Sequence, residues 1–187
     1  PKTLDTAFDV MGDIILSTAA QQYGGFTVPE VDKILAPYAK KSYDRYIEEF
    51  MQYSDPSWVG REEKAIERAL DKVRRDYDQG WQGIEYKLNT VGSSRGDYPF
   101  VTVTLGLGTE QFEKMCTVSL LEVHQGGQGK AGHKKPVLFP KIVFLYDKEI
   151  HGPGKCCEDI FEAGVECSSK TMYPDWLSMS GKGYISS

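Results

Sequence analysis

Cysteine and histidine are the side chains of this sequence best suited to redox, metal or nucleophilic chemistry. No C-x-x-C pair occurs among the four cysteines, which makes a zinc ribbon or a thioredoxin-type motif a poor fit; they are Cys116, Cys156, Cys157 and Cys167. None of the three histidines, His124, His133 and His151, lies three or four residues from another soft ligand. No metal site is therefore predicted in this segment, and His133 and His151 are expected to be solvated loop residues.

Cys167 stands where a predicted helix over residues 158–166 gives way to a predicted loop over 167–178. The dipole at a helix C-terminus disfavours a thiolate, and no histidine base is evident nearby in the sequence. Residue chemistry alone therefore favours a buried, inert thiol at Cys167. A neutral S–H group would suit hydrogen-atom transfer, in which the reactive species is a sulfur radical.

The run Gly126-Gly127-Gln128-Gly129-Lys130 resembles a phosphate-binding loop in composition. A P-loop lies between a strand and a helix and closes on Gly-Lys followed by Ser or Thr. Here the run follows a predicted helix, precedes a predicted strand and is followed by Ala131. It is therefore predicted to be a surface loop.

The first ninety residues have the apolar spacing of long amphipathic helices, expected over about 3–23, 28–50 and 61–88. Thr27 and Glu30 are expected to form a capping box at the start of the second helix, with Pro29 in its first turn. Pro37 predicts a kink or an early break in that helix. The narrow stripe of the third helix predicts packing along another long helix, as in a bundle or across a subunit interface.

The second half of the chain changes character after a polar loop at 91–97. Strands are predicted at 98–105 and 137–146, and helices at 109–124 and 158–166. This order predicts an α/β fold with a parallel sheet and right-handed crossovers. Two strands cannot close a sheet, so further strands must come from elsewhere.

Composition excludes several classes of protein. With 187 residues, 40% apolar residues and a net charge of −5, the chain is long enough for a folded core and too acidic for nucleic acid as a main partner. No apolar run approaches the roughly 18 residues of a membrane span. Sparse cysteines and the absence of a secretory segment favour a cytoplasmic location. Because the chain begins at Pro1, we expect it to be an internal fragment of a longer protein.

Several segments resemble anaerobic (class III) ribonucleoside-triphosphate reductases, which are glycyl-radical enzymes. The strongest are Phe-Pro-Lys-Ile-Val-Phe-Leu-Tyr-Asp at 139–147 and Glu-Cys-Ser-Ser-Lys-Thr-Met-Tyr-Pro-Asp at 166–175. Residues 22–25, 35–38, 89–92 and 99–102 resemble the same family in the same order. The resemblance covers almost the whole chain.

The resemblance implies a ten-stranded α/β barrel that reduces ribonucleoside triphosphates to deoxyribonucleoside triphosphates for DNA synthesis. In this family a glycyl radical passes its unpaired electron to a finger-loop cysteine, which the resemblance assigns to Cys167. The thiyl radical removes the 3′ hydrogen of the ribose, and the 2′ hydroxyl leaves as water. Ser168 and Ser169 would then lie beside the substrate.

The resemblance also implies partners and cofactors. It predicts a homodimer that contacts neither a membrane nor nucleic acid. The helical region, residues 1–90, would form the dimer interface and bind ATP or deoxynucleotide effectors. Candidate effector contacts are Gln22, Lys40 and Lys41. Residues 91–187 would form part of the barrel. The glycyl radical and a zinc site are expected outside this segment, with a radical S-adenosylmethionine iron–sulfur activase as partner. Formate or a thiol would be the reductant.

Because these parts lie outside it, the segment alone is expected to be inactive. One alternative is a non-catalytic, nucleotide-responsive interaction module derived from the reductase. Another is a stand-alone thiol enzyme that uses Cys167 or the Cys156–Cys157 pair, although no base for it is evident in the sequence.

Overall fold

The computed structural model describes residues 1–22, 24–90, 98, 100–130 and 132–180, and shows an α/β fold built on a parallel sheet. The sheet contains β1 (Phe26–Val28), β2 (Val101–Leu105), β3 (Lys141–Tyr146) and β4 (Asp175–Ser178), side by side in that order. Every neighbouring pair is parallel, with Val103 opposite Ile142 and Phe144 opposite Trp176. The predicted fold class is confirmed, and the four strands are compatible with part of an α/β barrel.

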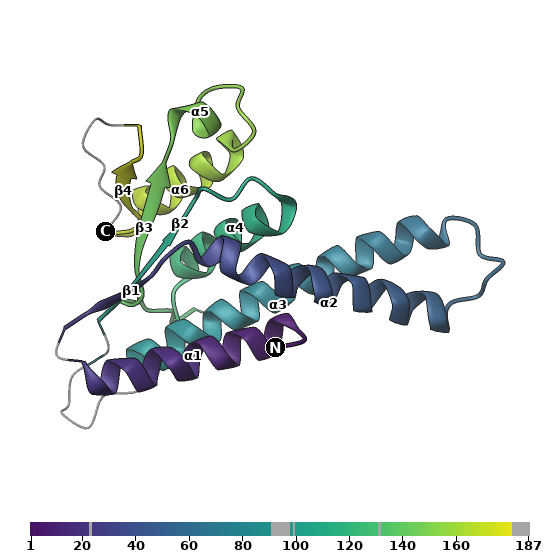
Figure 1. Cartoon of the computed structure of the whole chain (residues 1–187), viewed down its shortest axis with the longest axis horizontal. Coiled ribbons are helices and arrows are strands. Elements are labelled where there is room, and N and C mark those ends of the chain that lie inside the picture. The colour runs from purple at the N-terminus through teal and green to yellow at the C-terminus, as the bar shows by residue number, and fades with distance from the viewer. Residues whose placement is uncertain (23, 91–97, 99, 131, 181–187) are drawn as a thin grey trace.

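The described part of the chain has six helices: α1 (Leu4–Gln21), α2 (Val31–Tyr53), α3 (Arg61–Thr90), α4 (Gln111–Gly126), α5 (Lys148–His151) and α6 (Glu158–Lys170). Since the strand order follows the chain, right-handed crossovers place the connecting helices on one face of the sheet. Figure 1 shows α4 and α6 packed next to each other beside the strands. Val101, Val103 and Leu105 of β2 are buried, and Thr102 and Thr104 lie on the opposite face.

The long helices α2 and α3 form an antiparallel hairpin whose tip projects away from the sheet, and α1 packs along α3 (Figure 1). Phe8 of α1 stands edge-on to Trp81 of α3, with 5.1 Å between the ring centroids. Gly80 permits this approach, because a Cβ atom there would overlap the Phe8 ring. The predicted packing of the third helix along another long helix is therefore confirmed.

The start of α2 differs from the prediction. Thr27 lies in β1 and makes no capping box; the residue before α2 is Glu30, which has a left-handed φ of 45° and no side-chain cap. The Glu30 backbone N–H donates to Thr104 Oγ1 at 2.8 Å, which ties the start of the helix to β2. A strand of three residues depends on its pairing with β2, and local sequence cannot show that pairing.

Pro37 does not end α2, which runs without interruption from Val31 to Tyr53, so the predicted early break is wrong. A proline inside a helix removes one backbone hydrogen bond. The buried side chains of Leu35, Ala39 and Ser42 offset that loss by packing on both sides of it.

The predicted loop over 167–178 is also wrong. Helix α6 continues to Lys170, and β4 follows it after a short connection. The sheet therefore gains two strands that the sequence pattern missed, one of them from the first ninety residues, and one apolar core spans both halves of the chain. The loop predicted at 91–97 lies outside the described residues. Within the described ranges, no helix is long and apolar enough to cross a membrane.

Candidate functional site

The carboxyl end of the sheet is organised around the turn Gly106–Gly108, which follows β2. Asp32, from the first turn of α2, is fully buried, and its Oδ2 accepts the backbone N–H groups of Gly106 at 2.9 Å and Gly108 at 3.1 Å. Gly106 has a φ of 111°, which favours glycine. Burial raises the pKa of Asp32, although these backbone donors oppose the shift.

His151 holds the same turn from the other side. Its Nε2–H donates to the carbonyl oxygen of Gly106 at 2.7 Å, and its Nδ1 accepts the backbone N–H of Asp147 at 2.9 Å. Nδ1 also lies 3.0 Å from the Asp147 carbonyl oxygen, so both ring nitrogens are used by backbone groups. The prediction of a solvated His151 is wrong because α5 folds it inward until 1% of the residue is exposed; His133 is exposed as predicted.

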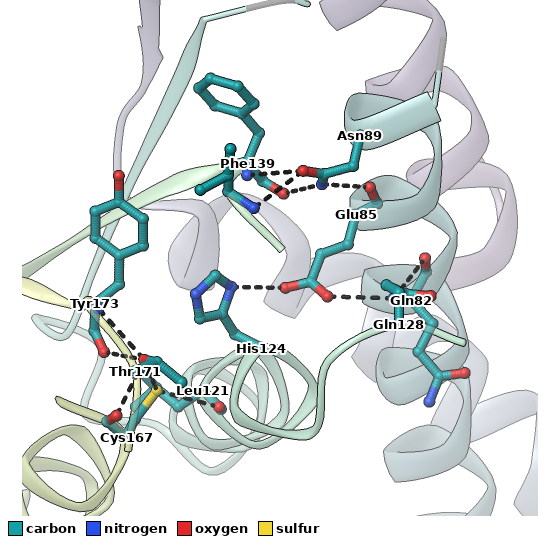
Figure 2. A network of polar contacts seen from close by, with 11 residues as sticks. Gln82, Glu85, Asn89, Leu121, His124, Gln128, Phe139, Cys167, Thr171 and Tyr173 are labelled. Carbon is teal, nitrogen blue, oxygen red and sulfur yellow. Dashed lines mark hydrogen bonds and ion pairs between the residues drawn. The ribbon is translucent and has the colours of Figure 1, made fainter. Parts of the chain in front are cut away.

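A second polar network lies at the amino end of the sheet and connects α3, α4 and the segment before β3 (Figure 2). Glu85 is fully buried; its Oε1 lies 2.9 Å from His124 Nδ1, and its Oε2 accepts a hydrogen bond from Gln128 Nε2 at 3.2 Å. The carboxylate therefore fixes Nδ1 as the donor and fixes the plane of the His124 ring.

Asn89 joins the end of α3 to the chain before β3. Its Oδ1 accepts the backbone N–H groups of Leu138 at 3.0 Å and Phe139 at 3.2 Å. Its Nδ2 donates to the carbonyl oxygens of Phe139 and Glu85 (Figure 2). One side chain thus satisfies four backbone groups, which fixes the entry into β3.

Cys167 lies in the last turns of α6 and not in the loop predicted over 167–178; its assignment as the finger-loop cysteine stays a prediction. It is fully buried, with Sγ 3.4 Å from the carbonyl oxygen of Leu121, to which the thiol donates, and 3.6 Å from Thr171 Oγ1 (Figure 2). Burial raises its pKa, so the thiol is neutral. Since α6 leads into the start of β4, this sulfur lies at the amino end of the sheet, opposite the Gly106–Gly108 turn.

The hydroxyl groups of Ser168 and Ser169 are bonded to protein. Ser168 Oγ donates to the carbonyl oxygen of Pro174 at 3.2 Å and accepts from Trp176 Nε1 at 3.2 Å. Ser169 Oγ donates to the carbonyl oxygen of Glu166 at 2.6 Å. The structure brings both serines close to Cys167 along α6, but their hydroxyls serve the helix end and β4.

The three candidate effector contacts do not meet within one chain. Lys40 pairs with Asp44 at 3.3 Å, and Lys41 lies over the Tyr38 ring. The backbone N–H of Leu4 donates to Ser42 Oγ, so this part of α2 lies beside the start of α1. Gln22 follows the last residue of α1, a helix of 18 residues and hence about 27 Å long.

The other cysteines are free thiols. Sγ of exposed Cys156 lies 3.6 Å from Sγ of buried Cys157, whose pKa is raised to about 11 by burial and by its neighbour. Cys116 is buried in α4, and burial raises its pKa too. Among the described residues, no group of three or more His, Cys, Asp or Glu side chains gathers to hold a metal ion.

Sequence reasoning missed Asp32, Glu85, Asn89 and the bonded role of His151. Glu85 had a detectable signal, because it follows Trp81 by four residues and precedes Leu88 by three, within the apolar stripe of α3. An acidic residue there needs a buried partner. Asp32 gave no signal, since acidic residues are common in the first turn of any helix.

Comparison with known proteins places this chain in a family. The family model described as anaerobic ribonucleoside-triphosphate reductase matches residues 1–186. Curated proteins of that name are 35% identical over 182 residues in enterobacteria phage T4, 36% over 179 in Haemophilus influenzae and 34% over 179 in Escherichia coli. Each alignment covers 95% of this chain but only 24–28% of the relative, so the chain spans about a quarter of their length. The chain belongs to the anaerobic ribonucleoside-triphosphate reductase family.

Proposed function

We propose that this chain forms part of the catalytic barrel of an enzyme that reduces ribonucleoside triphosphates to deoxyribonucleoside triphosphates by radical chemistry. The observation that carries the proposal is the family match across residues 1–186. The fold supports it, because a parallel sheet whose strands follow the chain order, with β1 and β4 at its edges, can continue into a larger barrel. The other strands of a ten-stranded barrel would come from the rest of the enzyme.

The carboxyl end of the sheet is the proposed substrate side. In α/β barrels the reacting groups gather on the loops that follow the strands. The Gly106–Gly108 turn occupies that position, and Asp32 and His151 hold its backbone from two directions. A turn held in this way can place backbone groups against a ligand without further ordering.

The proposed enzyme acts as a homodimer, responds to ATP or deoxynucleotide effectors and receives its glycyl radical from a radical S-adenosylmethionine activase. Gln22 is far along α1 from Lys40 and Lys41. One effector site that uses all three contacts would therefore draw them from two subunits.

Cys167 has two candidate roles. The resemblance proposes it as the thiyl residue that takes the 3′ hydrogen, and its neutral thiol suits that chemistry. Its position on α6, with the sulfur covered and bonded to the Leu121 carbonyl at the amino end of the sheet, favours a packing role.

Replacing Cys167 with serine in the complete, anaerobically activated reductase separates the two roles. Serine keeps a donor for the Leu121 carbonyl but cannot form a thiyl radical. Deoxynucleotide formation is measured by chromatography, and the glycyl radical by electron paramagnetic resonance. Loss of product with the radical retained supports the thiyl role, whereas turnover close to wild type supports packing. Cys116→Ser, which alters another buried thiol, is the matched control and should remain active. The reductase proposal itself fails if the unaltered, activated enzyme forms no deoxynucleotide.

A further inference from the structure

A pocket of about 450 Å³ lies next to the polar network at the amino end of the sheet, and His124 belongs to both. Three segments line it: residues 124–127 at the end of α4, residues 134–138 before β3, and residues 170–173, which begin with the last residue of α6. It lies at the opposite end of the sheet from the Gly106–Gly108 turn. A ligand bound there would therefore lie away from the proposed substrate side, at the same end of the sheet as Cys167.

His124 forms part of the pocket wall and is the side chain of this site that the fold holds in a fixed orientation. It is 3% exposed, and its Nδ1 is held by the buried carboxylate of Glu85. Its Nε2 has no hydrogen-bond partner among the described residues and faces the side on which Tyr173 lies (Figure 2), with 5.6 Å between the two ring centroids. A ring nitrogen that belongs to a nearly buried side chain, is oriented by a carboxylate and is left unbonded is available to a ligand.

The charge around the pocket is positive although the whole chain is acidic. Lys134, Lys135 and Lys170 line it, and no aspartate or glutamate does, in a protein with a net charge of −5. Lys170 also pairs with Glu166, which lies outside the lining. Lys134 and Lys135 form no ion pair among the described residues. Their ammonium groups favour an anion.

Most of the remaining side chains of the wall are apolar, apart from Gln125 and Thr171. Pro136, Val137 and Leu138 form one side, and Met172 and Tyr173 form another. A fully hydrated inorganic ion would gain nothing from these surfaces, whereas a ligand with an apolar body would bury against them. The pocket thus combines a cationic rim, an apolar wall and one buried imidazole.

We propose that this pocket binds a small organic anion, a phosphate or carboxylate carried on an apolar body. The anionic oxygen accepts a hydrogen bond from His124 Nε2–H, and Glu85 stabilises the charged imidazolium by accepting a hydrogen bond from its Nδ1–H. Lys134 and Lys135 supply the remaining positive charge, and the apolar body packs on Leu138 and Tyr173.

The test titrates the protein, labelled with ¹⁵N in its histidine rings, with phenyl phosphate, benzoate and neutral benzyl alcohol. We expect a saturable shift of the His124 Nε2 resonance with at least one anion and none with benzyl alcohol. Preference for phenyl phosphate or for benzoate identifies the anionic group. No shift with either anion, or an equal response to benzyl alcohol, overturns the proposal. The same titration on the complete reductase must give the same shift of the His124 Nε2 resonance. If the rest of the enzyme fills the pocket, no shift will occur, and that result would also overturn the proposal.

Variants locate the site. His124→Asn can still donate to Glu85 but offers nothing to the pocket, and it should weaken anion binding at least tenfold. The double variant Lys134→Ser/Lys135→Ser alters only exposed side chains, so it keeps the test valid if His124→Asn fails to fold, and it should weaken binding at least threefold. Lys155→Ser, at an exposed lysine outside the pocket, should bind as wild type does. Unchanged affinity in the double lysine variant contradicts the proposed site.

Discussion

The two ends of the sheet use buried polar side chains in different ways. At the carboxyl end, Asp32 and His151 bind backbone groups of the Gly106–Gly108 turn and its surroundings, and both ring nitrogens of His151 are occupied. At the amino end, Glu85 binds other side chains, and His124 keeps one ring nitrogen without a partner beside a pocket.

This difference separates a scaffold from a binding site. A side chain that satisfies backbone donors and acceptors fixes the path of the chain and has no capacity left for a ligand. A carboxylate that orients an imidazole leaves the far nitrogen available. Asp32 and His151 at the carboxyl end thus hold the Gly106–Gly108 turn, whereas Glu85 at the amino end leaves a ring nitrogen of His124 available to a ligand.

The largest expected effect is at Asp32. Asp32→Ala leaves the backbone N–H groups of Gly106 and Gly108 buried without their acceptor, which should lower the free energy of unfolding by about 2–5 kcal/mol. Urea denaturation followed by circular dichroism measures the loss. Asp32→Asn, which retains one oxygen acceptor, is the control and should lose less. Equal losses in the two variants would mean that these hydrogen bonds do not hold the turn.

The pH dependence sharpens the same comparison. Burial raises the pKa of Asp32, so its carboxyl ionises less readily in the folded than in the unfolded chain. Its contribution to stability is therefore fully present below the ordinary pKa and declines as the pH rises through the raised, folded value. Asparagine does not ionise, so wild type should lose stability relative to Asp32→Asn as the pH increases above about 4. The opposite trend would show that the backbone donors dominate.

A smaller and more local effect is expected at Asn89. Asn89→Ala removes three hydrogen bonds between the end of α3 and the segment before β3 and a fourth within α3, at a partly buried site, and should cost about 1–3 kcal/mol. Amide hydrogen exchange should accelerate at Leu138 and Phe139, while Gly106 and Gly108 keep their protection. Faster exchange at both ends of the sheet would show that the two ends are not independent.

The smallest effect is expected at Lys141, which pairs with Asp175 at 2.8 Å where β3 meets β4. Both side chains are about half exposed, so water and salt screen the pair. Lys141→Met should leave the denaturation midpoint unchanged within error. A clear loss of stability would mean that this surface pair, rather than the buried network, fixes the amino end.

The sequence predicted the parts of this fold that depend on long local patterns. The apolar spacing of α1 and α3 and the β-branched residues of β2 were sufficient to predict those elements and the parallel sheet. β1 and β4 were missed because short strands are stabilised by their neighbours. The placement of Cys167 failed for a related reason, since packing of α4 against α6 extends α6 past this residue.

The amino-acid sequence by itself determined the family, because several ordered segments can agree with a family without any knowledge of contacts. It also determined the fold class, because hydrophobic periodicity is local. Only the tertiary structure decided which polar residues act together. Glu85, His124 and Gln128 meet across α3, α4 and the loop that follows, and Asp32 reaches a turn more than seventy residues away. Such groups are brought together by packing of distant segments, and spacing along the chain does not encode that packing.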